Sequence, residues 1–365
     1  MRQLTEQSLE ALALGAALLG TGGGGDPYIG KLMARQAIQD NGPVTVIDLE
    51  ELQDTAVCAM SAVMGAPTVL VEKLPGEGEQ LAALRALEKH INKEITHIIC
   101  AEIGGMNSTL PIVTAARMSL PLVDCDAMGR AFPEIQMSTP TLSGIPASPI
   151  ALADDKGNSV VIDGVDNHWT ERLARSITID MGAAAFIALF AQTGKQVKES
   201  MIPNSLQLAE SIGGAIIEAR AQHSDPIQAA LIQIGGFRMF KGKITDVERR
   251  TVAGFARGRL NADGLDRDSG DTLEVEFQNE NLIAVVSGKT VATVPDLIAI
   301  LDSETGEPIT TEELRYGLRI QVIAAPCHPK WRSPEGLCLV GPRYFGYETD
   351  YVPVEQLVAS VGQET

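Results

Sequence analysis

The sequence predicts an α/β protein: a mostly parallel N-terminal sheet flanked by helices, then a helical segment and a C-terminal all-β domain. Three observations support this fold class. Short apolar runs alternate with amphipathic helices up to residue 124, as in parallel sheets covered on both faces. Helical spacing dominates 166–234, and from Phe237 alternating runs are separated by Gly, Pro, Asn and Asp. We therefore expect an α/β domain over 1–165 and a C-terminal part over 166–365, β-rich over about 236–350.

The N-terminal half opens with two predicted helices joined by a glycine-rich turn. Apolar residues recur with helical spacing from Thr5 to Leu19. Asp26-Pro27 has the residue types of a helix N-cap and first turn, and the helix stops at Asn41-Gly42. In chain order we then expect strands over 44–49, 57–64 and 68–71, a helix over 79–91, a strand over 95–101, a helix over 110–118, a strand over 120–124 and a hairpin of 150–153 with 160–163.

The C-terminal half divides into a helical and a β-rich stretch. We predict helices over 169–176, 183–192 and 205–222. Leu273, Val275 and Phe277 alternate with acids, as on a half-buried strand. Further strands are expected over 282–286, 291–294, 318–324 and 337–340.

Charge and composition exclude several classes of protein. The 365 residues hold 29 basic and 47 acidic side chains, a net charge of −18, whereas nucleic-acid binding needs basic patches. The basic cluster Arg249, Arg250, Arg257 and Arg259 reads as a solvated face. Apolar runs are about ten residues long, half of what a membrane span needs. The N-terminus lacks a signal-like apolar core, and the five cysteines fit a reducing compartment, so we expect a cytoplasmic protein without membrane contact.

The stretch LLGTGGGGDP at 18–27 resembles a nucleotide-binding loop. Gly20, Gly22 and Gly25 satisfy the pattern G-x-G-x-x-G. However, this loop follows a helix rather than a strand, and the Asp26 carboxylate competes for the amides that would bind phosphate. We therefore expect no nucleotide. The run from Gly22 to Gly25 (Gly22, Gly23, Gly24 and Gly25) is interpreted as a flexible rim of backbone donors for a carbonyl or small anion.

Acidic and amide side chains follow two neighbouring predicted strands. Glu102 comes directly after one strand, and Asp124 and Asp126 come at the end of the next. Ligands bind at the carboxyl ends of parallel strands, so these acids are expected to face one crevice. They are candidate catalytic residues, and Asp124 with Asp126 would also suit a divalent metal, which leaves the cofactor open. The candidate substrate-binding residues are Gly22, Gly23, Gly24, Gly25, Asp26, Gly104, Gly105, Asn107, Arg130 and Glu134.

Two further sites have alternative interpretations. Arg130 either pairs with Glu134 at helical spacing or holds a substrate carbonyl or carboxylate with its fork. Cys327 and His328 are adjacent, so on a strand their side chains would point apart, and with Cys338 they fall short of a zinc pattern. Whether this β-domain segment lines the crevice stays open.

Four of these stretches together resemble the S-methyl-thiohydantoin desulfurase-like family, long a domain of unknown function. They are LGTGGGGDP, AEIGGMNS, DCDAMGRAFPEIQM and GPRYFGYETDYVPV, in the family's order along nearly the whole chain. The resemblance implies an N-terminal α/β domain, a distinct β domain, chemistry on a thiohydantoin ring and an association with hydantoinase/oxoprolinase-type proteins. The positions that match the family are 22–26, Glu102, Gly104, Gly105, Asn107, Asp124, Asp126, Arg130 and Glu134.

Two classes of function are compatible with these residues. In the first, the protein is an enzyme acting on a small cyclic amide or thioamide, such as a hydantoin, an oxoproline or a thiohydantoin, by acid/base or metal-assisted hydrolysis. In the second, it is a non-catalytic metabolite-binding protein or the accessory partner of a hydantoinase/oxoprolinase-type enzyme. A homo-oligomer is compatible with either.

Overall fold

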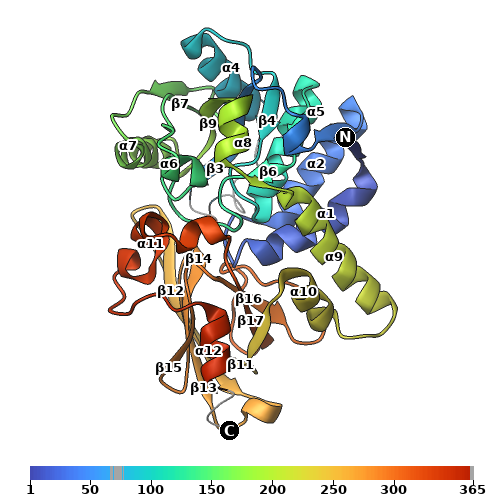
Figure 1. Cartoon of the computed structure of the whole chain (residues 1–365), viewed down its shortest axis with the longest axis vertical. Coiled ribbons are helices and arrows are strands. Elements are labelled where there is room, and N and C mark those ends of the chain that lie inside the picture. The colour runs from blue at the N-terminus through green and yellow to red at the C-terminus, as the bar shows by residue number, and fades with distance from the viewer. Residues whose placement is uncertain (66–68, 70–75, 77, 362–365) are drawn as a thin grey trace.

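Two β-sheets organise the chain, as a computed structural model shows for residues 1–65, 69, 76 and 78–361 (Figure 1). An eight-stranded sheet with helices forms the N-terminal unit, and a seven-stranded antiparallel sheet forms the C-terminal unit. The predicted fold class is therefore confirmed. Apart from residue 69, the strand expected over 68–71 lies outside the described residues.

The first sheet is mixed rather than mostly parallel. Its strands lie side by side in the order β1 (Arg2–Leu4), β2 (Val44–Ile47), β5 (Leu122–Val123), β4 (His97–Ile99), β3 (Val57–Gly65), β9 (Ala184–Thr193), β7 (Ile150–Ala153) and β8 (Ser159–Ile162). The neighbours β2, β5, β4 and β3 pair in parallel, and the other pairs are antiparallel.

The mixed character arises at β9, a segment for which the sequence analysis predicted a helix. Nearly all of its side chains are buried because β9 lies inside the sheet. A strand that is covered on both faces has a continuous apolar run with no period, and such a run does not distinguish a strand from a buried helix. The helix prediction over 183–192 was therefore wrong.

Helices accompany this sheet. They are α1 (Glu6–Leu19), α2 (Pro27–Asn41), α4 (Glu79–Ile91), α5 (Leu110–Met118), α6 (Thr139–Leu142), α7 (Asn167–Asp180), α8 (Gly194–Ser200) and α9 (Ser205–Ala221), with the short 3₁₀ turns η1 (Leu49–Glu51) and η2 (Gly105–Ser108). Helix α10 (Pro226–Ile234) packs on α9 and leads into the second sheet. Within the described residues, each helix is too short or too polar to cross a lipid bilayer.

Helix α9 packs closely on α1 through two glycines. A methyl group at Gly15 would lie 1.8 Å from the Ala209 carbonyl oxygen, and one at Gly213 would lie 1.9 Å from the Ala11 carbonyl oxygen. Only glycine allows backbones to approach this closely. This contact brings the start of α9 to a two-stranded sheet of β6 (Cys125–Asp126) and β10 (Ile202–Pro203).

The second sheet is antiparallel throughout, in the order β15 (Lys289–Thr293), β14 (Glu280–Val286), β13 (Thr272–Gln278), β12 (Phe255–Gly264), β11 (Phe237–Val252), β17 (Arg319–Ala325) and β16 (Leu297–Asp302). The rest of this half comprises η3 (Asp266–Asp268), η4 (Pro329–Arg332), α11 (Pro334–Val340), η5 (Pro342–Phe345) and α12 (Val354–Val361).

The strand predicted over 337–340 belongs to α11, so that prediction was wrong. Ser333 caps this helix, because its side chain accepts a hydrogen bond from the Gly336 N–H, and Pro334 occupies the first turn. A Ser-Pro start of this kind is a helix signal that outweighs the short apolar run after it.

One hydrophobic cluster extends across both units, and the second sheet has a further core of its own. Leu282, Leu297 and Ile323 of the second sheet belong to the same buried cluster as the strands of the first. Trp331 is fully buried between the units, where its indole N–H donates to the Met128 carbonyl at 2.7 Å. Much of the interface is therefore apolar, and the turn between β13 and β14 lies against the glycine-rich loop, where the Asn281 N–H donates to the Thr21 carbonyl at 2.8 Å.

Candidate functional site

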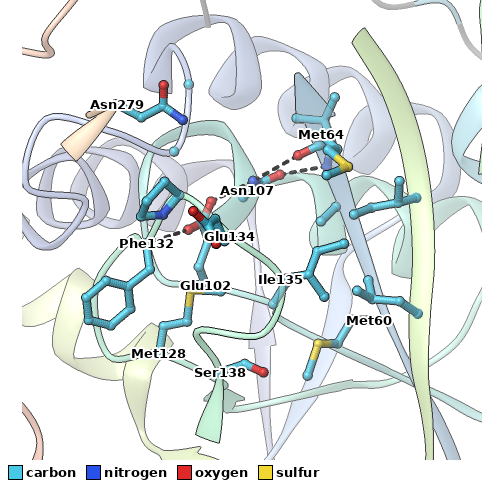
Figure 2. A pocket seen from close by; sticks show the side chains of 18 of the residues that line it. Met60, Met64, Glu102, Asn107, Met128, Phe132, Glu134, Ile135, Ser138 and Asn279 are labelled. Carbon is cyan, nitrogen blue, oxygen red and sulfur yellow. Dashed lines mark hydrogen bonds between the residues drawn. The ribbon is translucent and has the colours of Figure 1, made fainter. Parts of the chain in front are cut away.

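A cavity of about 90 Å³ lies where the ends of β3 and β4 meet the turn between β13 and β14 (Figure 2). Met60, Met64 and Ile135 form an apolar wall. The polar residues that line it are Glu102, Asn107, Glu134, Ser138, Arg175, Asn279 and Glu280, and the backbone of Gly24 and Gly25 completes the wall. A mainly apolar cavity with a few convergent polar groups is typical of a small-molecule site.

Glu102 is a buried acid in the wall of this cavity, as its position after β4 predicted. Its Oε1 accepts a hydrogen bond from the Asn107 side chain at 2.6 Å, and its Oε2 accepts from the Phe132 N–H at 3.3 Å. Burial raises the pKa of Glu102 to about 7, although these two hydrogen bonds oppose the shift. A carboxyl group with such a pKa exchanges a proton near neutral pH, as general acid–base catalysis requires.

Asn107 fixes the position of the Glu102 carboxyl. Its side-chain oxygen accepts from the Val63 N–H at 2.8 Å, and its side-chain nitrogen donates to the Val63 carbonyl at 3.2 Å as well as to Glu102. Figure 2 shows these bonds as dashed lines. The backbone of β3 thus dictates the amide orientation, and Asn107 presents an N–H to the carboxylate.

The glycine-rich loop follows α1 and precedes α2, which agrees with the argument against a dinucleotide site. Asp26 caps α2, as predicted, because its Oδ1 accepts from the Tyr28 N–H at 2.7 Å. Gly24 and Gly25 have φ values of 84° and 82°, a left-handed conformation that favours glycine.

This loop is packed, whereas the sequence analysis interpreted it as a flexible rim. A methyl group at Gly24 would lie 2.4 Å from the Gly104 carbonyl oxygen, and one at Gly23 would lie 2.0 Å from Glu280 Oε1. The Gly22 carbonyl accepts from the Thr311 N–H at 2.9 Å. The run of glycines therefore allows the loop to pack closely against two other segments. One contains Gly104 and Gly105, and the other is the turn that contains Glu280.

Asp124 does not line the cavity, contrary to the expectation that the three acids share one crevice. Its carboxylate accepts from the N–H groups of Leu206 and Gln207 at 2.8 and 3.2 Å and lies 3.6 Å from Arg2. Burial raises its pKa despite these contacts. Asp124 thus caps the N-terminus of α9, where a carboxylate is favoured.

Asp126 is also directed away from the cavity. Its Oδ2 accepts three backbone hydrogen bonds, from Ile103, Met128 and Gly129, and its Oδ1 accepts from the Ser205 hydroxyl. Burial raises its pKa to about 6 against these bonds. The side chain ties the first β-sheet to α9, so the geometry assigns it a structural position.

The described part of the chain has no group of three His, Cys, Asp or Glu placed to hold a metal ion. Cys327 and His328 do not line the cavity. The Cys327 N–H donates to Asp296, and the His328 ring accepts from the Lys330 N–H at 3.3 Å. The β domain reaches the cavity through Asn279 and Glu280 instead.

Arg130 is fully buried between the two units and has no N–H left for a substrate. Its guanidinium has five N–H groups, and each one donates to an acceptor of the protein. These acceptors are the Thr21 hydroxyl and the carbonyls of Ala131, Asn281, Pro295 and Asp296. Arg130 therefore joins the glycine loop to the second sheet.

Glu134 does not pair with Arg130, since the segment between them is not helical. Glu134 lines the cavity and accepts from the Tyr344 hydroxyl at 2.7 Å and from Gln136. Tyr344 belongs to the stretch GPRYFGYETDYVPV, so this stretch contacts the cavity wall.

Glu280 is the acid of the cavity that the sequence analysis missed, together with the polar residues Ser138, Arg175 and Asn279. It opens β14, is 2% exposed and lines the cavity. Burial raises its pKa well above the usual range, and the nearby Glu102 adds to this shift while Arg130 opposes it. The only sequence signal was a polar run, Gln278 to Asn281, between apolar strands, which normally indicates an exposed turn.

Comparisons with known proteins agree with the two-unit architecture. Residues 7–164 match the family model described as the S-Me-THD-like N-terminal domain, and residues 165–354 match that of the S-Me-THD-like C-terminal domain. A crystal structure of a Chromobacterium violaceum protein, from the Northeast Structural Genomics Consortium, superposes with a TM-score of 0.79 at 24% identity and covers 97% of this chain and 100% of its own. No curated protein matches the chain.

Proposed function

Because this chain belongs to the S-Me-THD-like family, we propose that it is an enzyme that hydrolyses a small thiohydantoin-like ring compound in the cavity beside Glu102. Family membership supports a thiohydantoin-related function in general terms. The observation that carries the proposal is Glu102 itself, a buried carboxyl with a pKa of about 7 in the wall of a small cavity.

Glu102 acts as the general base in this proposal. Its carboxylate takes a proton from a water molecule while the water oxygen bonds to the ring carbon that carries sulfur. A positioned base of this kind contributes about 10²- to 10⁴-fold to the rate. The Asn107 amide holds the carboxylate in place throughout, because its orientation is fixed by Val63.

The glycine loop supplies the electrostatic support. Gly24 and Gly25 form part of the cavity wall, and their backbone N–H groups receive the negative charge that develops on the substrate. One such donor contributes about 2.7–4 kcal/mol. Six of the other predicted residues affect this site through the packing of the glycine loop and of α9. They position the reacting groups and take no part in the reaction themselves. They are Gly22, Gly23, Asp26, Asp124, Asp126 and Arg130.

The overall reaction replaces a C–S bond by a C–O bond. Water and an S-alkyl thiohydantoin give a hydantoin, whose ring carbon now bears a carbonyl, and a free thiol. The ring is small and uncharged, and it has both amide and apolar edges, which suits a cavity lined by methionines and a few polar groups.

Turnover of a panel of rings tests this function. S-methyl-thiohydantoin, thiohydantoin, hydantoin and 5-oxoproline are incubated with the protein, and thiol release and ring products are measured. We expect Glu102→Gln to lower kcat about 10²- to 10⁴-fold and Glu94→Gln, a matched change at an exposed glutamate outside the cavity, to keep kcat within about threefold. A rise in melting temperature with a ring and no turnover would instead support a metabolite-binding protein.

A further inference from the structure

Glu280 sits on a turn whose conformation is fixed on both sides. Asn279 has a φ of 59°, its N–H donates to the Ala256 carbonyl at 2.7 Å, and its side-chain oxygen accepts from the Ala256 N–H at 2.8 Å. On the other side, the Asn281 N–H donates to the Thr21 carbonyl at 2.8 Å. These contacts hold the backbone of the turn in place, with the Glu280 side chain packed against Gly23 of the glycine loop.

The carboxyl group of Glu280 is incompletely satisfied. Its Oε2 is buried and has no hydrogen-bond partner among the residues that the structure describes. Its Oε1 lies where a methyl group on Gly23 would be, so the absence of a side chain at Gly23 makes room for it. A buried oxygen without a partner costs stability, and such groups in native proteins commonly mark a functional site.

The charges around Glu280 favour a neutral carboxyl. Glu102 and Glu312 are the acids whose charges act on it, and Arg130 is the cation. The five N–H groups of Arg130 are bonded elsewhere, so it offers no hydrogen bond to Glu280. Two carboxyl groups at one buried cavity resist joint ionisation, and the deeper one stays protonated.

We propose that Glu280, contributed by the C-terminal domain, is the catalytic acid that works with Glu102. In this role Glu280 Oε2 donates its proton to the ring nitrogen next to the carbon that water attacks. This inference rests on the proposed hydrolytic function, and it adds that the reaction needs both domains, since each one contributes a carboxyl to the same cavity.

The protons balance over two steps. In the first, the water oxygen bonds to the ring carbon, Glu102 takes one water proton, Glu280 gives its proton to the ring nitrogen, and the C=N double bond becomes single. In the second, the C–S bond breaks, the sulfur takes the proton from Glu102, and the hydroxyl proton returns to Glu280 as the carbonyl forms. Both carboxyls regain their starting states, and the products are a hydantoin and a thiol.

The test compares Glu280→Gln with wild type and with Glu94→Gln, a matched change at an exposed glutamate. The amide of glutamine still donates a hydrogen bond but cannot transfer a proton. We therefore expect kcat on S-methyl-thiohydantoin to fall about 10²- to 10⁴-fold while the dissociation constant for hydantoin, the product ring, stays within about threefold. Wild-type kcat in folded Glu280→Gln would overturn the assignment.

Infrared spectroscopy reports the protonation state directly. At about pH 8.5, where Glu102 is mostly ionised, we expect a protonated carboxyl band in wild type and Glu102→Gln that disappears in Glu280→Gln. The absence of this band would show that Glu280 is ionised and would overturn its role as an acid.

The outcomes separate this inference from the proposed function. If wild type turns over the ring and Glu280→Gln does so equally, only the role of Glu280 fails. If wild type turns over no ring of the panel, whether or not it binds one, the proposed function fails and the catalytic role of Glu280 fails with it. Should Glu280→Gln not fold, the wild-type rate at high pH decides, because a catalytic acid requires kcat to fall as it ionises.

Discussion

The raised pKa of Glu102 can be tested through protein stability as well as through activity, by comparing wild type with Glu102→Gln. Glu102 is 6% exposed, and burial raises its pKa from the ordinary value of 4.5 to about 7 in the folded protein. The folded state therefore holds this proton more tightly than the unfolded chain does. The stability that Glu102 contributes is complete below about pH 4.5 and is lost as the pH rises through about 7.

The size of this effect follows from the pKa shift. Each pKa unit corresponds to about 1.36 kcal/mol, so the rise of Glu102 from 4.5 to about 7 corresponds to roughly 3.4 kcal/mol in full. About 2.5 kcal/mol of this change falls between pH 5 and pH 8, because at pH 5 the unfolded chain is already mostly ionised at this position. Glutamine does not titrate, so this contribution of the carboxyl at position 102 is absent from Glu102→Gln.

Urea unfolding at several pH values, followed by circular dichroism, measures the effect. We expect the unfolding free energy of wild type, taken relative to Glu102→Gln, to fall by about 2.5 kcal/mol from pH 5 to pH 8. Glu94→Gln, at an exposed position, controls for the general loss of a negative charge. A difference between wild type and Glu102→Gln that does not change with pH would refute the raised pKa and, with it, the argument for a base poised near neutrality.

Two further substitutions test the packing that positions the site. Arg130→Lys should lower the unfolding free energy by about 3 kcal/mol or more, because lysine cannot replace five fixed N–H donors. The control Arg315→Lys, on the surface, should have little effect. Equal unfolding midpoints of the two variants in urea would contradict this prediction. Gly23→Ala should lower kcat at least about tenfold, because the added methyl group displaces Glu280. Gly214→Ala should leave kcat unchanged, because a methyl group there meets nothing within 4 Å. Steady-state rates of the two variants test this prediction.

Local sequence patterns predicted much of the fold. They also predicted the site residue that comes directly after a strand, Glu102. The helical spacing before Leu19 and the cap at Asp26 identified the glycine loop as a helix-to-helix connection, which counted against a nucleotide. The position of Glu102 after a buried strand indicated an acid at the cavity. These predictions succeed because capping and periodicity depend on residues within one or two turns of each other.

Such local patterns do not predict which part of the fold a side chain will face. Asp124 and Asp126 do share a face, but that face meets the start of α9, whose position depends on the close glycine contacts between α9 and α1. The strand β9 was mistaken for a helix because its burial on both faces removes any period.

The sequence by itself determined the α/β and β units, the capped helices and one acid of the site. Only the tertiary structure decided that Glu280 belongs to the same cavity as Glu102, although 178 residues separate them in the chain. In the sequence Glu280 is one of four polar residues at a turn, where water normally solvates a carboxylate. Docking of that turn on the glycine loop removes the water, and this desolvation, a property of the assembled chain, makes the carboxyl a candidate acid.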